Sequence, residues 1–593
     1  MDTCKKEEVA LKGLFLGPQA ENQNWVLEQV ETLLKAWFQW RQNFRPGDGI
    51  AISDQDMLQP EYILRRQTTE AVLLELSKRF ENEIPKFSPR YIGHMFSEVS
   101  LPALFGHILT LLHNPNNISA ESSLVGTQVE DEAIAALSLM MGLEQGVGHF
   151  TSGGTVANFE AVYRALARCY DWMAAGLEDG SSSAFASSLM GWHRYQMLPA
   201  DLKERSACLN PTATNPFVAS ASISAKTERT FLGPILLVPQ HKHYSWVKAA
   251  HVFGLGAEAF WSVKLNSHGH LDVMDLRKKI ELAQEQDRPI AMIVSVLGTT
   301  ELGMIDPIDE VAQVVAELKE KHDWHLWHHV DAAYGGFLCS LQGDDSEVCD
   351  VLSPVSLAAV KAVRFATSVT IDPHKLGYVP YACGAFIAAA GQDYYQRSFG
   401  GPYVNFSQGY DKGLFTLEGS RSATGAVATW MTARCVGLGQ QGYGRIIART
   451  IRLRKELEQR LCSEIPEVRV APFGDANLLG FCLAANGDSV QEVNKRTLSI
   501  YESFSGSADT DFFVSKTYLY KKSYSQYVDS FVQSWQGSND CEGLVLIRLC
   551  IMNPFFRSIE MKNDFLTLFV NALKQRVTGD PKGHQGSEIF MNY

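Results

Sequence analysis

Several features that mark particular protein classes are missing from this chain of 593 residues. None of its 11 cysteines forms a Cys-x-x-Cys pair, which disfavours a zinc ribbon or a dithiol redox site. The longest uncharged apolar run, near residues 289–298, is about half the length of a membrane span. The net charge of −13 offers no basic surface to nucleic acid or to an anionic membrane. Scattered thiols and a charged N-terminus without a signal-peptide pattern lead us to expect a cytoplasmic protein.

The length and the hydrophobic pattern divide the chain into three predicted parts, because 593 residues exceed one hydrophobic core. Residues 1–104 have apolar side chains at helical spacing and predict a helical segment that packs on a partner or another domain. Residues 105–430 alternate short apolar strands with helices, which is typical of an α/β architecture with a mainly parallel sheet. Residues 431–593 predict a smaller α+β domain. Residues 176–230, rich in Ser, Ala and Thr, predict an insertion with irregular stretches.

The run Ser368–Lys375 is the most informative stretch of the chain. Residues 369–371 read as a buried strand, and Pro373 ends it because proline cannot donate to a β-ladder. A lysine at that strand end, beside His374, suits a reaction that needs one amine in a fixed place. The favoured chemistry is a Schiff base with a carbonyl cofactor, which predicts an enzyme that uses pyridoxal 5′-phosphate (PLP).

A second motif, Thr151–Asn158, lies between a predicted strand and a predicted helix. Gly153 and Gly154 allow backbone N–H groups to approach an anion, and a helix N-terminus adds a favourable dipole. The hydroxyl of Thr155 can add a further bond. The run matches neither the Walker P-loop nor the dinucleotide fingerprint, and a simple helix cap explains it equally well. It indicates a phosphate without identifying which one.

A third motif, His329–Gly336, places Asp331 at the end of a buried strand and before small residues. In a PLP enzyme, a carboxylate at this point would hold the pyridine nitrogen protonated and make the ring an electron sink. Taken alone, an aspartate that caps the next helix is the commoner explanation.

Two further strand ends carry polar groups. The run His241–Trp246 follows a strand predicted at residues 235–238, and an imidazole from it can stack on an aromatic cofactor, although a lone histidine is more often structural. No carboxylate or third histidine at ligand spacing supports a metal there. Thr299, in the run Leu297–Thr300, can present a hydroxyl or simply belong to a turn. Ligands bind at the carboxyl ends of strands in open α/β sheets, so these motifs together predict one site.

These residues resemble the group II PLP-dependent amino-acid decarboxylases of fold type I, over roughly residues 85–560. The strongest matches are Ser368–Lys375, His329–Gly336 and Ser152–Asn158. The continuation Leu376–Tyr381 is most similar to the bacterial tyrosine decarboxylases, as are the runs Ser88–His94, His241–Trp246 and Arg548–Pro554.

The resemblance implies a role for each matched residue. Lys375 would bind the cofactor covalently, with His374 beside its phosphate, and Asp331 would pair with the pyridine nitrogen. His243 would stack on the ring and is a candidate proton donor. The other implied contacts are Gly154, Thr155 and Ser368 with the phosphate, Ala333 with the second face of the ring, Thr299 with the ring oxygen, His94 and Tyr381 with substrate, and Arg548 with the substrate carboxylate or the active-site framework.

The family also has a mobile loop that closes the site across a homodimer and carries a tyrosine that protonates the α-carbon. The resemblance places this loop at residues 399–410, with Tyr403 as the best match and Tyr410 as the rival. Aldehyde-forming relatives have phenylalanine at that position, so a tyrosine favours simple decarboxylation. We therefore expect a homodimer with shared active sites.

The expected activity is α-decarboxylation of an L-amino acid, with tyrosine or another aromatic amino acid as the leading substrate because of the matches around His94 and Tyr381. Aspartate or glutamate is the alternative substrate. Transamination, lyase chemistry or aldehyde-forming oxidative deamination on the same scaffold is the alternative reaction. A non-catalytic scaffold is disfavoured because Lys375, Asp331, His243 and a loop tyrosine are all present.

Overall fold

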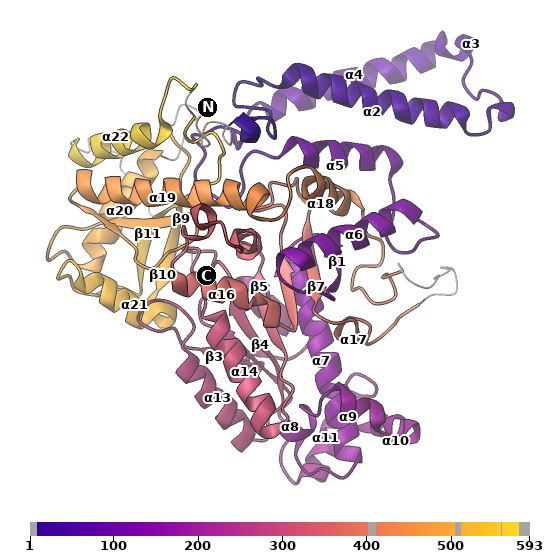
Figure 1. Ribbon diagram of the computed structural model, residues 1–593, viewed down its shortest axis with the longest axis vertical. Coiled ribbons are helices and arrows are strands. Elements are labelled where there is room, and N and C mark those ends of the chain that lie inside the picture. The colour runs from indigo at the N-terminus through magenta and orange to yellow at the C-terminus, as the bar shows by residue number, and fades with distance from the viewer. Residues whose placement is uncertain (1–8, 401–410, 505–510, 559, 580–593) are drawn as a thin grey trace.

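A computed structural model describes residues 9–400, 411–504, 511–558 and 560–579 of the chain. Two β-sheets organise these residues (Figure 1), one of seven strands and one of four. The larger sheet has the strand order β1-β7-β6-β5-β4-β2-β3 and the smaller one the order β10-β11-β9-β8. Where the predicted domains divide, near residues 104 and 430, stays a prediction.

The seven-stranded sheet carries the residues that matter most. Its parallel part joins β3, β2, β4, β5 and β6, and β1 and β7 close one edge in antiparallel register. The strands are β1 (Val147–Thr151), β2 (Ile235–Pro239), β3 (Phe260–Val263), β4 (Ile290–Val296), β5 (His328–Ala332), β6 (Ser368–Ile371) and β7 (Gly384–Ala388). The predicted mainly parallel α/β sheet is confirmed. β3 and β7 were not anticipated, since each is a short segment without a distinctive pattern.

Helices cover both faces of this sheet (Figure 1), and its strands β2, β4 and β7 are completely buried and almost entirely apolar. The principal ones are α6 (Leu124–Met140), α7 (Gly154–Glu178), α12 (Tyr244–Val252), α13 (Val273–Glu285), α14 (Ile308–His322), α16 (Pro354–Ala362) and α18 (Thr424–Cys435). α7 begins directly after β1 and is buried along most of its length. It therefore carries residues from the strand ends deep into the core.

The predicted insertion at residues 176–230 is more regular than expected. α7 continues to Glu178, and four short helices and one 3₁₀ turn follow: α8 (Ala184–Ser187), α9 (Trp192–Met197), α10 (Ala200–Arg205), η2 (Ser206–Leu209) and α11 (Pro216–Thr227). α8, α9 and α10 have only four to six residues, too few for a clear amphipathic period, which is why the sequence pattern looked irregular.

The four-stranded sheet is antiparallel and forms the C-terminal α+β unit. Its elements are α19 (Arg445–Glu464), β8 (Val468–Val470), β9 (Leu478–Leu483), α20 (Val490–Phe504), β10 (Ser515–Tyr520), α21 (Lys521–Gln533), β11 (Gly543–Cys550) and α22 (Phe565–Thr578). Of these, α20, β10, α21 and α22 were not anticipated from the sequence.

The N-terminal part forms a long helical hairpin of α2 (Gln23–Asn43) and α4 (Pro60–Phe80), joined through the short α3 (Asp54–Met57). The hairpin extends away from the rest of the molecule (Figure 1), and neither long helix has a buried residue. Its contacts with α5 (Leu101–His113) include an edge-to-face pair of Trp25 and Phe105, with ring centroids 5.3 Å apart. Among the helices that the structure describes, none is both long and apolar enough to cross a membrane.

Candidate active site

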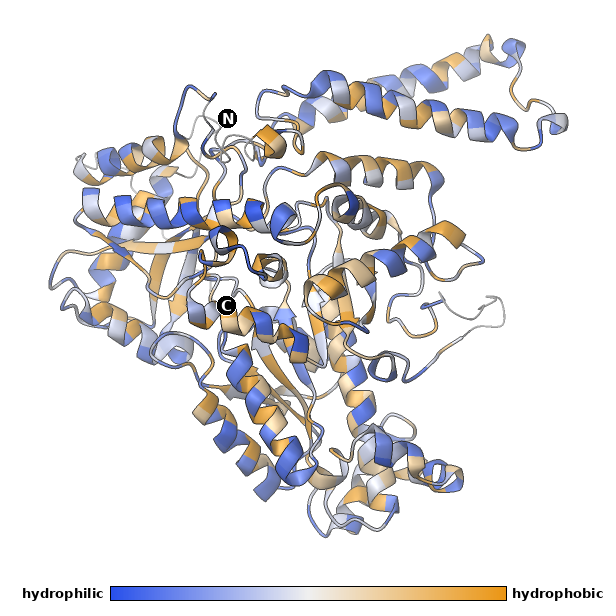
Figure 2. Cartoon of the chain, in the orientation of Figure 1, coloured by the Kyte–Doolittle hydropathy of each residue, from blue (hydrophilic) through white to orange (hydrophobic). Residues whose placement is uncertain are grey.

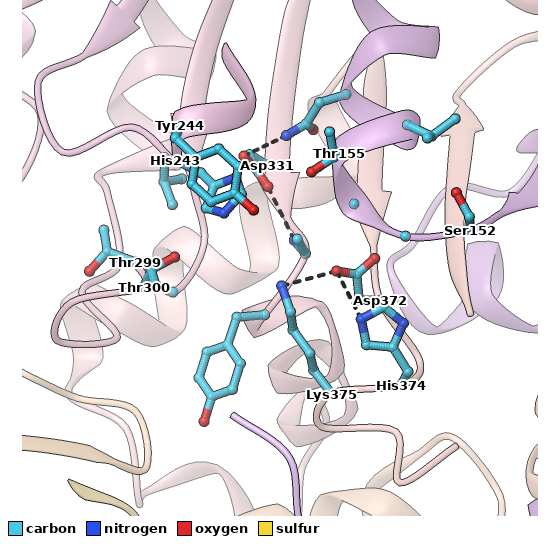
Figure 3. Close-up of a pocket in the computed structure, with 18 of the residues that line it drawn as sticks. Ser152, Thr155, His243, Tyr244, Thr299, Thr300, Asp331, Asp372, His374 and Lys375 are labelled. Carbon is cyan, nitrogen blue, oxygen red and sulfur yellow. Dashed lines mark hydrogen bonds and ion pairs between the residues drawn. The ribbon is translucent and has the colours of Figure 1, made fainter. Parts of the chain in front are cut away.

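A cavity of about 330 Å³ lies at the carboxyl ends of the parallel strands and gathers the motifs singled out above (Figure 3). Each motif follows a different strand, so the sheet brings together residues that are more than 200 positions apart. The predicted site residues in its lining are Gly154, Thr155, His243, Thr299, Asp331, Ala333, His374 and Lys375.

The N-terminus of α7 forms one end of the cavity. No side chain caps the first turn of this helix, so its backbone N–H groups are available to an anion, and Ser152 and Thr155 add hydroxyls (Figure 3). Space here is tight, since a Cβ on Gly154 would come within 2.9 Å of the Ala333 methyl and 2.8 Å of an Asp372 oxygen. A side chain at position 154 would fill the space at the helix N-terminus, and glycine leaves that space open to a phosphate group.

Lys375 points into the cavity from the segment after β6 (Figure 3). Its Nζ lies 3.0 Å from Oδ2 of Asp372, whose side chain is almost fully buried. The His374 ring lies against Gly153 and its Nδ1 accepts a hydrogen bond from the Cys383 backbone, which leaves Nε2 to carry the proton. Burial lowers the pKa of His374, despite the nearby Asp372 carboxylate.

Asp331 is the penultimate residue of β5 and lies in a network of hydrogen-bond donors. Its Oδ2 accepts hydrogen bonds from Asn158 Nδ2 and from Trp246 Nε1, both at 2.9 Å. Its Oδ1 accepts a longer bond, of 3.3 Å, from the Ala333 backbone. The two donors on Oδ2 fix the orientation of the carboxylate, and Oδ1 keeps acceptor capacity for a cationic ring nitrogen. The alternative of a simple helix cap does not account for this arrangement.

His243 is the N-cap of α12, and its ring lines the cavity. Its Nδ1 lies 2.9 Å from the Ser245 hydroxyl and accepts the Ser245 backbone N–H at 3.3 Å. An acceptor at Nδ1 leaves the proton on Nε2 in the neutral ring. Burial lowers the pKa of His243, outweighing the opposite effect of Asp331.

Thr299 and His241 complete the floor of the cavity. The Thr299 hydroxyl accepts a hydrogen bond from the Met304 backbone at 3.0 Å, so its own proton is free to be donated. His241 Nε2 lies 2.9 Å from Oδ1 of Asp306, and both residues are fully buried. Burial lowers the pKa of His241, but the Asp306 carboxylate outweighs it and raises the pKa overall. This pair places an imidazole with a raised pKa beneath the cavity.

The expected phosphate contact of Ser368 is wrong. Ser368 is fully buried, and its hydroxyl accepts from Trp327 Nε1 at 2.8 Å and lies 2.8 Å from His329 Nδ1. It is not part of the cavity lining. Ser368 begins β6, so it lies at the opposite end of that strand from the cavity, which is formed at the carboxyl ends.

Arg548 holds the framework of the site together. It donates to the backbone oxygens of Thr300 and Gly93, to Ser515 Oγ and to His94 Nδ1, at distances from 2.7 to 3.5 Å. With these contacts, the framework role fits Arg548 better than a substrate carboxylate does. Neither Arg548 nor His94 reaches the cavity lining.

An aromatic ledge adjoins the cavity. Tyr381 stacks on His374 with ring centroids 4.1 Å apart, and it also meets Phe96 edge-to-face at 6.0 Å. Phe96 in turn stacks on His94 at 6.0 Å. Tyr381 is 56% exposed, so this ledge of His94, Phe96, Tyr381 and His374 presents aromatic surface beside the site.

The proposed loop tyrosines, Tyr403 and Tyr410, lie outside the described residues. Phe399, at the start of that segment, is 70% exposed and is fixed by a backbone bond to Leu414.

Comparisons with known proteins identify the family of this chain. The model of the "Pyridoxal-dependent decarboxylase conserved domain" matches residues 224–472. The chain is 30% identical to the L-tyrosine decarboxylase of Levilactobacillus brevis, over 96% of both proteins. The chain belongs to the pyridoxal-dependent decarboxylases. The chain is also 26% identical to the L-aspartate decarboxylase of Thermococcus kodakarensis, over 73% of its own length and 88% of that protein.

The fold of the decarboxylase agrees with this membership. The crystal structure of mouse CSAD has a TM-score of 0.61 and 19% sequence identity, covering 92% of this chain and 98% of that one. The fold-type-I prediction is therefore confirmed, as are PLP as the cofactor and amino-acid decarboxylation as the reaction.

Sequence reasoning missed several residues of this decarboxylase's site. Asn158, Asp372 and Trp246 all lie inside motifs that the sequence displays, but no local pattern shows which partner each will meet. Phe96 follows the His94 match by two positions and gave no signal of its own. Their functions depend on contacts between segments far apart in the chain.

Proposed function

We propose that this decarboxylase acts on L-tyrosine or a related aromatic L-amino acid and releases CO₂ and the primary amine. The similarity to a tyrosine decarboxylase along 96% of both chains carries the proposal. The aromatic ledge of His94, Phe96, Tyr381 and His374 supports it, since aromatic side chains favour edge-to-face and offset contacts with an aromatic substrate.

PLP, when bound, supplies an electrophilic carbonyl and a ring that accepts electrons as the substrate carboxylate leaves. The N-terminus of α7, with Thr155 and Gly154, would bind its phosphate. His374, with its proton on Nε2, would lie beside the same group. These contacts fix one end of the cofactor, so that Lys375 meets the carbonyl at a constant position.

Asp331 and His243 would set the electronic state of the ring. The Asp331 carboxylate, held by Asn158 and Trp246, would keep a proton on the ring nitrogen. His243 would stack on one face, and the methyl of Ala333 would pack on the other. Thr299 would donate its free proton to the ring oxygen.

Two groups are proposed to return a proton to the α-carbon. His243 carries a proton on Nε2 at the cavity, where it can be donated. Tyr403 is the second proposed donor, with Tyr410 as the alternative; both rest on the family resemblance alone.

We further propose a homodimer, in a cytoplasmic setting, whose subunits meet through the N-terminal hairpin. α2 and α4 carry large apolar side chains that are exposed in the single subunit, including Trp40 at 55% and Leu64 at 61% exposure. Figure 2 shows such apolar residues interspersed with polar ones along both helices. Many large apolar side chains exposed on one unit favour an interaction site there. A second copy of the chain fits because the family builds its site from two subunits.

Aspartate is the second candidate substrate, because of the similarity to an aspartate decarboxylase over 73% of the chain. An acidic side chain would require a second basic group beside the cavity. Within the described residues, the basic side chains of the cavity lining are Lys375 and three histidines, two of which have a lowered pKa. Arg548 is occupied by framework bonds.

Release of CO₂ from each of the twenty amino acids by the purified, PLP-loaded enzyme tests the substrate. Turnover is expected to be highest with tyrosine, and preference for aspartate or glutamate would overturn the aromatic assignment. Analysis of the organic product tests the reaction outcome, with amine expected. An aldehyde as the main product would identify oxidative deamination instead.

A further inference from the structure

A chain of buried polar groups runs from the interior of the sheet to the cavity. It starts at Trp327, whose Nε1 donates to Ser368 Oγ at 2.8 Å, and continues from Ser368 to His329 Nδ1 at 2.8 Å. His329 Nε2 then lies 3.4 Å from Asn158 Oδ1. All four of these residues are at most 1% exposed.

The directions of these hydrogen bonds follow from the donors. Trp327 can only donate, so the Ser368 hydroxyl accepts from it and gives its own proton to His329 Nδ1. Neutral His329 then carries its proton on Nε2 and donates it to the Asn158 amide oxygen. Burial lowers the pKa of His329 to about 4, which keeps the ring neutral at physiological pH.

Asn158 divides this chain into two branches that both end at the cavity. Its amide nitrogen donates to Asp331 Oδ2 at 2.9 Å and to Ser245 Oγ at 3.1 Å. An NH₂ group has two protons, so one side chain satisfies both acceptors. Ser245, having accepted from Asn158, is oriented to donate to His243 Nδ1 at 2.9 Å.

We propose that Asn158 is a positioning residue that sets the carboxylate of Asp331 and the ring of His243 together. Its amide orientation is fixed by His329 on one side, so neither acceptor can rotate without breaking the shared network. The proposal rests on the cofactor placement given above, in which Asp331 meets the ring nitrogen and His243 meets the ring face.

An alternative view is that Asn158 only fills space in a packed core. It is 1% exposed, so removing its side chain costs stability in either case. The distinction requires a readout of ring recognition that packing alone does not change. Replacing the ring nitrogen of the cofactor by carbon provides it, because the carbon analogue cannot use the Asp331 carboxylate.

The experiment measures binding of two probes to the full-length cofactor-free enzyme by equilibrium dialysis: PLP and 1-deazapyridoxal 5′-phosphate. Asn158→Leu keeps the branching of the side chain, removes both donated protons and adds no charge beside Asp331. We expect PLP to bind about ten- to a hundred-fold more weakly, and the deaza analogue to lose clearly less. The ratio of the two losses in affinity measures how much of the effect depends on contact between Asp331 and the ring nitrogen.

A matched pair of variants distinguishes the effect of this hydrogen-bonded chain from the effect of replacing any buried histidine. His329 and His328 are neighbours on β5, both at most 1% exposed, but His328 bonds to Ser295 and not to Asn158. His329→Gln is expected to weaken PLP binding in the same selective way, to a smaller extent, and His328→Gln to leave the ratio between the two probes unchanged.

Equal losses for both probes in Asn158→Leu would overturn the positioning role, as would unchanged binding of PLP. A selective loss in His328→Gln as large as that in His329→Gln would also overturn it. Failure of the wild-type enzyme to bind PLP more tightly than the deaza analogue would instead refute the pairing of Asp331 with the ring nitrogen. That outcome is distinct because it needs no variant.

Discussion

The amine of Lys375 lies 3.0 Å from the carboxylate of Asp372, three residues earlier in the same turn. Asp372 is 2% exposed, so this carboxylate depends on nearby cations for compensation. The relation gives Lys375 a structural function besides its chemical one. Variants at position 375 will therefore change stability as well as activity.

Lys375→Ala and Lys375→Arg separate the two functions. Both variants should lose at least about a thousand-fold in turnover, because neither can bind the cofactor covalently. Lys375→Ala also leaves Asp372 without its closest cation and should lose about 1–3 kcal/mol of stability, the cost being moderated because the lysine is partly exposed. Lys375→Arg keeps a positive charge and should retain most of that stability. Thermal unfolding of the cofactor-free proteins measures the difference, and equal melting temperatures for both variants would contradict the expectation.

Arg548→Met should lower stability and turnover together. The substitution removes donors from the backbone oxygens of Thr300 and Gly93 and releases His94, all of which lie around the cavity. Buried acceptors left without donors cost about 1–3 kcal/mol each. Arg548→Lys keeps the charge but not the planar fork and should recover only part of the loss. If Arg548 instead bound the substrate carboxylate, Arg548→Lys would raise KM with little change in the melting temperature.

Stability should rise with pH between about 3 and 6.5, because burial lowers the pKa of His328 to about 3 and that of His329 to about 4. In that range the unfolded chain binds protons at these positions and the folded chain does not, so acid favours unfolding. Each such histidine contributes a slope of about 1.4 kcal/mol per pH unit.

His328→Gln should reduce the slope of unfolding free energy against pH by about 1.4 kcal/mol per pH unit. Urea denaturation at a series of pH values measures this slope. Ser295→Ala is the control, since it removes the hydrogen-bond partner of His328 but leaves the titrating ring in place. A slope unchanged by His328→Gln would contradict the assignment.

Charge on the N-terminal hairpin should dissociate the proposed dimer. Leu64 and Leu73 on α4 are 61% and 58% exposed, and the double substitution to glutamate places two charges on apolar surface that a second subunit would bury. Sedimentation velocity should show a shift from dimer to monomer, accompanied by loss of activity. Gln67→Glu, on the same helix, adds charge at a polar position and is the control. A monomeric wild-type enzyme would refute the dimer itself.

Much of the site could be predicted from the sequence because its motifs follow strand ends, where local signals are strong. Lys375, Asp331 and His243 each lie next to a short apolar run that predicts a strand, and the parallel sheet then brings them together. The prediction for Ser368 was wrong because this residue lies at the start of its strand and not at the end. Its hydroxyl bonds to Trp327.

What the sequence could not show is how these groups are paired. Asn158 lies 173 positions from Asp331 and 87 from Ser245, yet bonds to both. Nothing local distinguishes its amide from that of any polar residue in a buried helix. Asp372 likewise reads as part of a strand-ending turn until its distance to Lys375 is known.

Asn158 lies one turn after Gly154 on α7, so the helix fixes the distance between the two positions. Four residues span about 6 Å along a helix axis, so the anion-binding end and the group that holds Asp331 are separated by a length the backbone sets. Only a ligand whose anion and ring nitrogen have a matching separation can engage both ends at once. Pyridoxal without its phosphate, or a nucleotide with its charge farther from the ring, would satisfy one end and leave the other unpaired.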